Sequence, residues 1–455
     1  MIFSKVADYL DHHSERFVEE LKDFLRIPSI SAASEHAVDV RRAAEFVARQ
    51  LNQIGVEATL EETGGHPVVT GHWLKAPGAP TALVYGHYDV QPVDPLEQWN
   101  SHPFDPVQRE DWIYARGATD DKGQIFTHFK AVEAWLQAVG NLPCNLKFLI
   151  EGEEEVGSKH LHAFLERNKT RLACDIVVVS DTPQFAPGLP AITYGLKGLA
   201  YYQVNLRGPA QDLHSGTFGG AVSNPANALT KLLGELVDPN GVIQLPGFYD
   251  DVLPLDNWER EQFAALPFDE AAYLKQLDVS ALFGEQGYST LERRWARPTC
   301  DLNGLWSGYR GEGAKTIIPH RAWAKLSFRL VPNQDPATIS LSLRGFLQER
   351  SPPGVRMELE ELDARPAILF PTNSSYVQAA SRAIEAGFGI KPVFIREGSS
   401  IPVLNSFKEL LGADSLLLGW GLPENNTHSP NEKFRLADFH AGTRASAHLW
   451  HELAN

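Results

Sequence analysis

Three short runs between residues 82 and 158 concentrate the side chains that bind metal ions and transfer protons. Their sequences are YGHYDVQP, GATDDKGQ and EGEEEVGS. The third run holds four carboxylates within five residues, at Glu151, Glu153, Glu154 and Glu155. Carboxylates at this spacing repel one another strongly unless cations neutralise them. The residue types and their spacing therefore indicate a metal site.

Hydrophobic patterns place these runs at the ends of secondary-structure elements. The apolar segment TALVY precedes His87 and Asp89, and NLKFLI precedes the acidic run, so both runs are expected at the ends of buried strands. A pattern with helical spacing follows GATDDKGQ, which places Asp120 and Asp121 at a helix start. The run CDIVVVS leads to Asp181 in the same way as the other strands. Strand ends are where open α/β sheets carry their chemistry, so we expect these groups at the functional edge of one sheet.

Strands and helices alternate along the first part of the chain, which predicts an α/β fold with a mostly parallel sheet flanked by helices. Helices are predicted at 3–26, 37–54, after Asp120 and at 433–451, and strands at 56–60, 67–73, 81–86 and 145–150. After PQFAPGLP the segment GLAYYQVNLR alternates as a half-exposed strand, and a long irregular stretch is expected over 240–297. We therefore predict a catalytic domain over 1–190 and 364–455, with an α+β domain inserted over 191–363.

Composition excludes several classes of protein. The 455 residues suffice for two domains, and 43% hydrophobic with 22% charged residues is typical of a soluble globular protein. A formal charge of −16 without a basic cluster argues against a nucleic-acid partner. No apolar run approaches the roughly 20 residues that span a bilayer, and the first residues carry charges where a signal peptide needs an apolar core. The scattered Cys144, Cys174 and Cys300 fit reduced thiols, which predicts a cytoplasmic protein.

The motifs resemble those of a known family. GHYDV, RGATDDKG, EGEEEVGS, SD at 180–181 and THSPNEK near the C-terminus occur in the order typical of the M20 metallopeptidases. They resemble in particular the dipeptidase branch that includes carnosinase-like enzymes, which DLHSGTFGG, GAKTIIP, FRLVPN and REGSSIP also match. The resemblance spans nearly the whole chain. It implies a zinc-peptidase catalytic domain and makes the inserted domain a lid and dimerisation domain.

The resemblance also implies two divalent metal ions per subunit. It makes His87 and Asp181 ligands of one zinc ion, Glu155 and His428 ligands of the other, and Asp120 the bridge between them. These carboxylates offset much of the charge of two divalent ions in a low-dielectric cleft. Manganese and cobalt are alternatives to zinc, because carboxylate and imidazole ligands accept several divalent ions. The peptide bond after Asp120 is also expected to be cis.

The implied reaction is hydrolysis of the amide bond of dipeptides or short peptides by water that two zinc ions activate. Glu154 is the general base, which takes the water proton and delivers it to the leaving amine. Asp89 accepts a hydrogen bond from the free ring nitrogen of His87 and so fixes its tautomer. The resemblance makes these assignments, whereas the local sequence alone does not decide which of Glu153, Glu154 and Glu155 is base or ligand.

Four residues outside the metal motifs are assigned to the substrate by the same resemblance. Arg329 grips the C-terminal carboxylate of the substrate, a task that suits a planar donor with two parallel N–H groups. Thr316 and Ser400 are supporting hydrogen-bond donors. His214 stabilises the oxyanion, and the family places this histidine in the site of the neighbouring subunit, which predicts a homodimer.

Other interpretations of these residues stand beside the metal site. Asp120 also suits a helix N-cap, Asp181 a strand-end turn and His428 a loop before a helix. Glu151 and Glu153 are interpreted as solvated or hydrogen-bonded carboxylates rather than ligands. An N-acyl amino acid deacylase, or a related amidohydrolase, would keep the whole metal site and differ only in the pocket. A scaffold protein that had lost catalysis would show a broken ligand set, and this sequence does not.

Overall fold

The protein, described by a computed structural model over residues 2–455, forms two compact units. Unit 1 comprises the described chain up to Tyr194, then Phe370–Ile395 and Pro402–Asn455. Unit 2 comprises Gly195–Leu369 and Arg396–Ile401. The boundaries of the predicted insertion, 191–363, lie within several residues of those of the longer segment of unit 2, Gly195–Leu369. The return of the chain to unit 2 at 396–401 does not follow from the sequence patterns.

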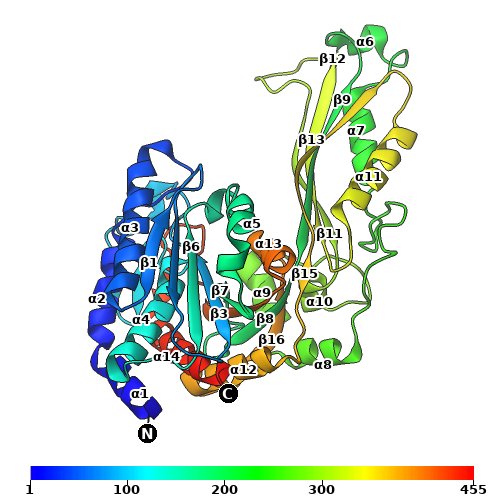
Figure 1. The fold of residues 1–455 in the computed structure, drawn as a ribbon. Coiled ribbons are helices and arrows are strands. Elements are labelled where there is room, and N and C mark those ends of the chain that lie inside the picture. Colours follow the sequence, from blue (N-terminus) through cyan, green and yellow to red (C-terminus); the bar gives the residue numbers. More distant parts are fainter. Residues whose placement is uncertain (1) are drawn as a thin grey trace. The chain divides into compact units, whose positions relative to one another are not determined.

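Unit 1 is built on a β-sheet whose strands run in the order β1-β2-β6-β3-β7-β17-β8 (Figure 1). Their bounds are Glu57–Glu61, Val68–Trp73, Asn145–Glu151, Thr81–His87, Ile176–Pro183, Asp414–Gly421 and Ala191–Leu196, in that order, and β16 (Val393–Glu397) also pairs with β8. The central strands β6, β3, β7 and β17 are parallel, whereas β1, β2 and β8 pair antiparallel. The α/β class is confirmed, but the sheet is mixed, because the short connection over 62–67 cannot form the crossover that a parallel pair requires.

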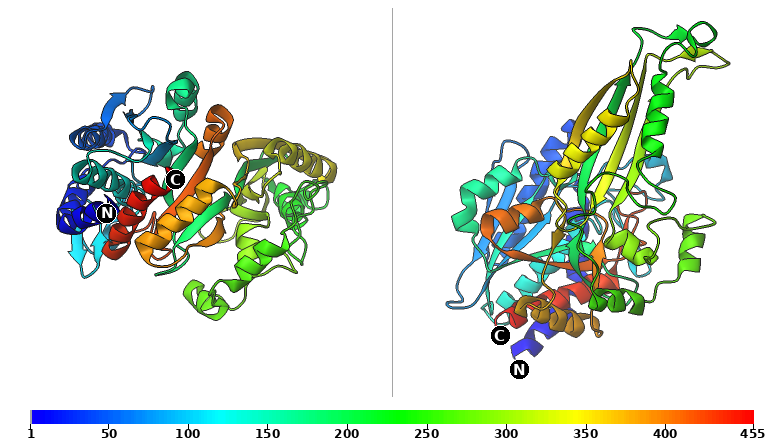
Figure 2. Two further views of the ribbon diagram at one scale, coloured as in Figure 1. Left: turned by 60° about the horizontal axis from the view of Figure 1, so that its bottom comes forward. Right: turned by 90° about the vertical axis from the view of Figure 1, so that its right-hand side faces the viewer.

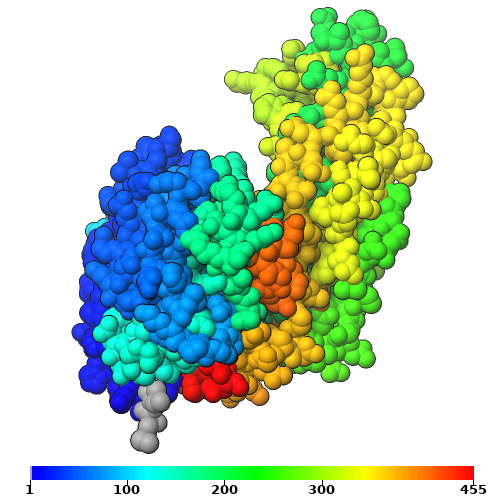
Figure 3. Space-filling model, in the orientation of Figure 1, coloured from blue at the N-terminus to red at the C-terminus, as the bar shows by residue number. Residues whose placement is uncertain are grey.

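Helices cover both faces of this sheet. One face carries α3 (Ala37–Gln53), α4 (Lys122–Ala138), α12 (Ser375–Phe388) and α14 (Leu436–Leu453), and the other carries α5 (Leu161–Leu172), α13 (Val403–Ser406) and the π-helical turn Phe407–Leu411. Helices α12 and α14 run side by side (Figure 2). Little of α14 reaches the surface on the face shown in Figure 3, in keeping with the burial of Phe439 and Trp450.

Successive residues of each strand point to opposite faces of the sheet and pack against the helices on that face. On β3, Val84 joins the cluster that includes Phe126 and Phe129 of α4, whereas Tyr85 points the other way and packs against Phe407 at 5.2 Å between ring centroids. These strands are buried on both faces, so the carboxyl ends of the strands are fixed in position by packing from both sides.

Three predicted elements differ from the structure. The first helix is two helices, α1 (Ile2–His12) and α2 (Ser14–Leu25), because the His13 ring and the Ser14 hydroxyl hydrogen-bond to backbone carbonyls of the preceding turn. The stretch 240–297 is not wholly irregular: the side chains of Asp256, Asp269 and Ser289 cap the short helices α8 (Asn257–Ala265), α9 (Glu270–Leu277) and α10 (Thr290–Trp295). The last helix starts at Leu436, since β18 (Lys433–Arg435) pairs with β5 (Trp112–Tyr114), which in turn pairs with β4 (Val107–Arg109).

Unit 2 is centred on an antiparallel sheet with the strand order β11-β13-β9-β14 (Figure 1). Their bounds are Thr299–Ser307, Arg321–Leu330, Gly198–Arg207 and Arg356–Arg365. Helices α7 (Pro225–Gly234) and α11 (Pro336–Arg350) cover one face and enclose a second hydrophobic core. The smaller elements are β10 (Leu213–His214), α6 (Ser215–Phe218), β12 (Ile317–Ile318) and β15 (Ile368–Leu369). Within residues 2–455, no helix combines the length and hydropathy needed to cross a bilayer.

Candidate metal centre

The candidate ligands lie at the carboxyl ends of neighbouring strands and in the loops that follow them. Strands β6, β3 and β7 are parallel neighbours, and His87 at the end of β3 stands in register with Glu151 at the end of β6. Asp181 lies within β7, two residues before the end of the strand. Because parallel strands present their carboxyl ends at one edge, segments distant in the sequence meet here.

The ligand atoms form two groups that share one carboxylate. His87, Asp120 and Asp181 each offer one atom, all within 4.8 Å of one another, and Asp120, Glu155 and His428 do the same. His87 Nε2 lies 3.0 Å from Asp120 Oδ1. His428 Nε2 lies 2.9 Å from Asp120 Oδ2 and 3.3 Å from Glu155 Oε2. The two oxygens of Asp120 thus face different histidines, which is the arrangement that a carboxylate bridging two cations requires.

The imidazole of His87 is oriented for a cation. Its Nδ1 lies 3.0 Å from the carbonyl oxygen of Asp89, which only accepts, so Nδ1 carries the proton of the neutral ring. Its Nε2 is buried, has no hydrogen-bond partner among residues 2–455, and lies 3.0 Å from Asp120 Oδ1. A buried imidazole lone pair directed at carboxylates suits a metal ligand. The donor set therefore fits a divalent metal ion.

The carboxylates of the site are buried close to one another, which disfavours their ionised forms. Burial, followed by repulsion from Asp120, raises the pKa of Asp181 and of Glu155. Burial also raises the pKa of Glu154 to about 8, with Glu155 and Asp120 adding to the effect. Burial acts in the same direction on Asp120, but its close contacts with His428 and His87 outweigh burial and lower the pKa of Asp120. Bound cations would reverse the raised values, since positive charge favours ionised carboxylates.

Asp89 joins the first run to the third. Its Oδ1 and Oδ2 accept hydrogen bonds from the backbone N–H groups of Glu154 at 3.3 Å and Glu155 at 3.1 Å. The His87 ring contacts the Asp89 carbonyl oxygen at 3.0 Å, while the Asp89 carboxylate lies 3.4 Å away. The predicted tautomer control thus involves chiefly the main chain of Asp89, and its side chain holds the turn that bears Glu154 and Glu155.

The two remaining glutamates of the acidic run are hydrogen-bonded, as predicted, and lie outside both ligand groups. Glu151 accepts hydrogen bonds from the Tyr85 hydroxyl at 2.6 Å and the Ser158 hydroxyl at 2.9 Å. Glu153 lies 2.8 Å from the Nδ1 atom of His160. These contacts satisfy both carboxylates within the protein.

Two residues at the site were missed by sequence reasoning. Gln91 Nε2 donates a hydrogen bond to Glu155 Oε2 at 2.7 Å. Glu432, which is fully buried, accepts a hydrogen bond from the backbone N–H of Asp120 at 3.1 Å. Both lie inside motifs, YGHYDVQP and THSPNEK, but no spacing within those motifs distinguishes them from other polar residues. The peptide bond between Asp120 and Asp121 is cis, as predicted.

The residues predicted to bind the substrate all belong to unit 2, whereas the metal-ligand candidates, Asp89 and Glu154 belong to unit 1. The structure brings two of them together: β10 ends at His214 and pairs with β12, and the Ser215 N–H donates to the Thr316 carbonyl at 3.1 Å. Arg329 lies on β13, and Ser400 lies in the segment 396–401.

The His214 ring has a defined hydrogen-bond partner. Its Nδ1 accepts a hydrogen bond from the backbone N–H of Gly216 at 3.0 Å. In a neutral ring the proton must then be on Nε2, which is free to donate. The side chain is exposed. This tautomer suits a donor to a developing negative charge.

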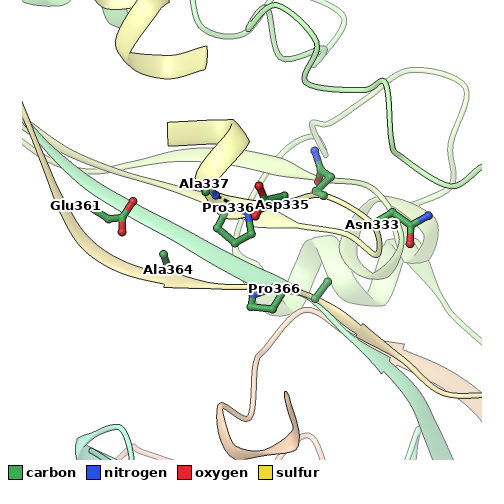
Figure 4. Close-up of a pocket in the computed structure, with 9 residues that line it drawn as sticks. Asn333, Asp335, Pro336, Ala337, Glu361, Ala364 and Pro366 are labelled. Carbon is green, nitrogen blue, oxygen red and sulfur yellow. Dashed lines mark hydrogen bonds between the residues drawn. The ribbon is translucent and has the colours of Figure 1, made fainter. Parts of the chain in front are cut away.

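A cavity of about 570 Å³ in unit 2 lies beside the start of α11 (Figure 4). The carboxylate of Asp335 is occupied there in capping α11, because it accepts the N–H groups of Ala337 at 3.2 Å and Thr338 at 3.1 Å. Apart from Asn333, Gln334, Asp335 and Glu361, the lining consists of proline and alanine, and it includes none of the predicted site residues.

Comparisons with known proteins agree with this geometry. Residues 83–452 match Peptidase family M20/M25/M40. Beta-Ala-His dipeptidase of Homo sapiens is 32% identical over 472 residues, covering 100% of this chain and 93% of the relative. Cys-Gly metallodipeptidase dug1 of Schizosaccharomyces pombe is 32% identical over 479 residues, covering 100% and 99%. The crystal structure of the M20 family metallo-carboxypeptidase Sso-CP2 of Sulfolobus solfataricus superposes with a TM-score of 0.85 at 35% identity, covering 96% of this chain and 99% of that one.

The chain belongs to peptidase family M20/M25/M40. The prediction of an M20-type metallopeptidase is confirmed, and with it the dependence of the enzyme on divalent metal ions. The identity of the metal, the oligomeric state, the cellular location and the roles of individual residues stay predictions.

Proposed function

We propose that this protein is a di-metal dipeptidase that hydrolyses the amide bond of dipeptides with a free C-terminal carboxylate. The observation that carries the proposal is the pair of three-residue groups that share Asp120. The similarity over the full chain to enzymes named Beta-Ala-His dipeptidase and Cys-Gly metallodipeptidase supports the choice of dipeptides as substrates.

Two divalent ions per subunit would be held by the two groups, one by His87, Asp120 and Asp181 and the other by Asp120, Glu155 and His428. Zinc is the first candidate, because it favours nitrogen and carboxylate ligands, and manganese and cobalt are alternatives. When bound, such ions polarise the carbonyl group of the substrate and make water more acidic.

The side chains of unit 1 carry the proton transfers. Glu154 accepts a proton from the attacking water and passes it to the nitrogen of the leaving amine. Asp89 positions Glu154 by accepting its backbone N–H at 3.3 Å. No serine or cysteine nucleophile is required, since water attacks directly.

Residues of unit 2 bind the substrate in this proposal. The Arg329 guanidinium pairs with the C-terminal carboxylate, and Thr316 and Ser400 donate further hydrogen bonds. His214 donates from Nε2 to the oxyanion, and the hydrogen bond from Gly216 to its Nδ1 supports this tautomer.

We propose that the enzyme is a homodimer in which His214 serves the site of the partner subunit. The exposed edge strand β11 supports this, because its apolar side chains Leu302, Leu305 and Trp306 are 51%, 52% and 41% exposed. We also propose a cytoplasmic location, which the three unpaired cysteines support.

A metallo-carboxypeptidase that removes single residues from longer peptides is the second candidate. The similarity to the Sulfolobus solfataricus enzyme at 35% identity favours it. Both activities require a free C-terminal carboxylate and the same metal chemistry, so they differ in the length of peptide that is accepted.

A substrate panel tests the proposal. Protein freed of metal with a chelator is reconstituted separately with zinc, manganese or cobalt and assayed on Cys-Gly, β-Ala-His, matched tripeptides and tetrapeptides, a C-terminally amidated dipeptide and N-acetyl amino acids. We expect metal-dependent hydrolysis of dipeptides and none of the amidated analogue. Faster cleavage of the longer peptides would favour the carboxypeptidase, and cleavage of the N-acetyl amino acids alone would make the protein a deacylase.

A further inference from the structure

The carboxylate of Glu432 is surrounded by hydrogen-bond donors from one loop. Its Oε1 accepts the backbone N–H groups of Thr119 at 2.9 Å and Asp120 at 3.1 Å. Its Oε2 accepts the backbone N–H of Gly117 and the Arg116 guanidinium, both at 2.9 Å. Glu432 is fully buried, and Arg116 is buried with it. All four donors lie in the segment 116–120 that ends at the bridging Asp120.

Glu432 lies in the loop that carries His428, and it ties this loop to the segment 116–120. A second contact ties the same two segments: Asn425 Nδ2 donates to Thr119 Oγ1 at 2.8 Å, and Thr119 Oγ1 donates to the Lys433 carbonyl at 2.7 Å. The Lys433 N–H donates in turn to the Asn425 carbonyl at 3.0 Å. The loop is therefore closed on itself between residues 425 and 433 and fastened to the segment that precedes Asp120.

An ionised carboxylate at the position of Glu432 is energetically unfavourable. Burying an ionised acid is unfavourable unless donors satisfy it, and Glu432 lies near a site that is already rich in negative charge. An apolar side chain would fill the space without that cost, but it would leave three backbone N–H groups without acceptors. Glutamine would offer one acceptor oxygen, and its NH₂ group would face N–H donors.

We infer that Glu432 is a positioning residue that holds Asp120 and His428 in the geometry required for metal binding. The inference rests on the metal centre under Proposed function and deepens it. Glu432 does not touch the metal position. It fixes the main chain at Asp120, whose two oxygens face both histidines, so its loss acts on both metal groups at once.

The test compares Glu432→Gln with a matched variant, Glu133→Gln, in the full-length protein. Glu133 is also a buried carboxylate with cationic and hydroxyl partners, Lys130 at 2.9 Å and Tyr9 at 3.1 Å, but it lies in α4 away from both ligand loops. Metal affinity is measured by competition with a zinc chelator, the ligand field by the visible spectrum of the cobalt-substituted protein, and the fold by circular dichroism and thermal unfolding.

We expect Glu432→Gln to bind zinc about 10- to 100-fold more weakly and to alter the cobalt spectrum, which is the usual effect of removing a group that orients metal ligands. Glu133→Gln should lower the unfolding temperature and leave affinity and spectrum unchanged. Wild-type affinity and spectrum in folded Glu432→Gln would overturn the inference. If wild type itself binds no divalent metal, the proposed function fails instead.

Thr119→Val supplies a milder change in case Glu432→Gln does not fold. It removes both hydrogen bonds of the Thr119 hydroxyl and leaves Glu432 in place. We expect a smaller weakening of zinc binding in the same direction. An unfolded Glu432→Gln together with unchanged zinc affinity in Thr119→Val would show that these contacts serve the fold alone and would overturn the inference.

Discussion

Asp120 Oδ2 lies 2.9 Å from His428 Nε2, while the other oxygen of the same carboxylate faces His87. One side chain therefore belongs to both candidate metal groups. We expect wild-type protein to carry two divalent ions per subunit after reconstitution and Asp120→Ala to retain neither, as measured by elemental analysis of desalted protein. Glu153→Gln is the control, since Glu153 lies outside both groups and should leave the stoichiometry unchanged. A wild-type value of one ion per subunit contradicts the shared bridge.

Substitution of Glu154 should impair catalysis, whereas substitution of the neighbouring Glu155 should impair metal binding. Glu154→Gln should keep both metals and lower kcat by about 10²- to 10⁴-fold, because an amide cannot accept the proton of water. Glu155→Gln should lower metal occupancy, and excess metal should restore part of its activity. Metal analysis and steady-state kinetics of the two variants check this. The reverse pattern would mean that the assignment within the acidic run is shifted by one residue.

Metal removal should destabilise unit 1. Burial and mutual repulsion of Asp181, Glu155 and Glu154 oppose the ionised state of each, so bound cations stabilise the folded protein relative to the unfolded chain. At a free metal concentration of 100 times Kd the effect per site is about 2.7 kcal/mol. We expect a chelator to lower the unfolding temperature and added zinc to restore it in calorimetry. Asp120→Ala, the control, should show little response to either addition.

A buried histidine predicts a specific sensitivity to acid. Burial lowers the pKa of His128 to about 3, and its Nε2 lies 2.8 Å from the Ser180 hydroxyl. The pKa of His128 in the folded protein lies below the ordinary value of about 6.5. The neutral ring therefore makes its full contribution to stability above pH 6.5, and this contribution is lost as the pH falls toward the folded pKa. In this window the unfolded chain binds one more proton. The free energy of unfolding should therefore fall by about 1.4 kcal/mol more per pH unit in wild type than in His128→Gln. Equal slopes in urea titrations between pH 6 and pH 4 contradict this.

The sequence predicted the site better than it predicted the surrounding contacts. Local patterns placed His87 and the acidic run at strand ends and Asp120 at a helix start, because the hydrophobic spacing of those elements is clear. The choice of Glu155 within the acidic run came from the family resemblance alone. Glu432 was missed because three of its four donors are backbone N–H groups of a loop that is 312 residues away at Asp120. Every residue except proline has a backbone N–H group, so no sequence motif marks the residues that make such a contact.

The errors in the fold have the same origin. The direction of β1 and β2 depends on a connection too short for a crossover, and the break at His13 depends on side-chain hydrogen bonds that compete with the helix. Hydrophobic periodicity reports neither effect. The helices within 240–297 were missed because they are short and held by single capping residues such as Asp256 and Asp269.

The last prediction concerns the proposed shared site of the dimer. His214 lies in unit 2, outside all metal motifs, and its Nδ1 accepts the Gly216 N–H, which leaves Nε2 as a donor. Removing a donor to an oxyanion costs about 10²- to 10³-fold in rate, so His214→Ala should lower kcat by that amount and keep both metals. Glu154→Ala should also be inactive. In a mixture that exchanges subunits, one site of each heterodimer combines an intact Glu154 with an intact His214 from the partner. Activity should therefore rise above that of either parent, with tagged subunits and native mass spectrometry measuring the exchange. Complete exchange without a gain in activity would mean that His214 acts within its own subunit or not at all.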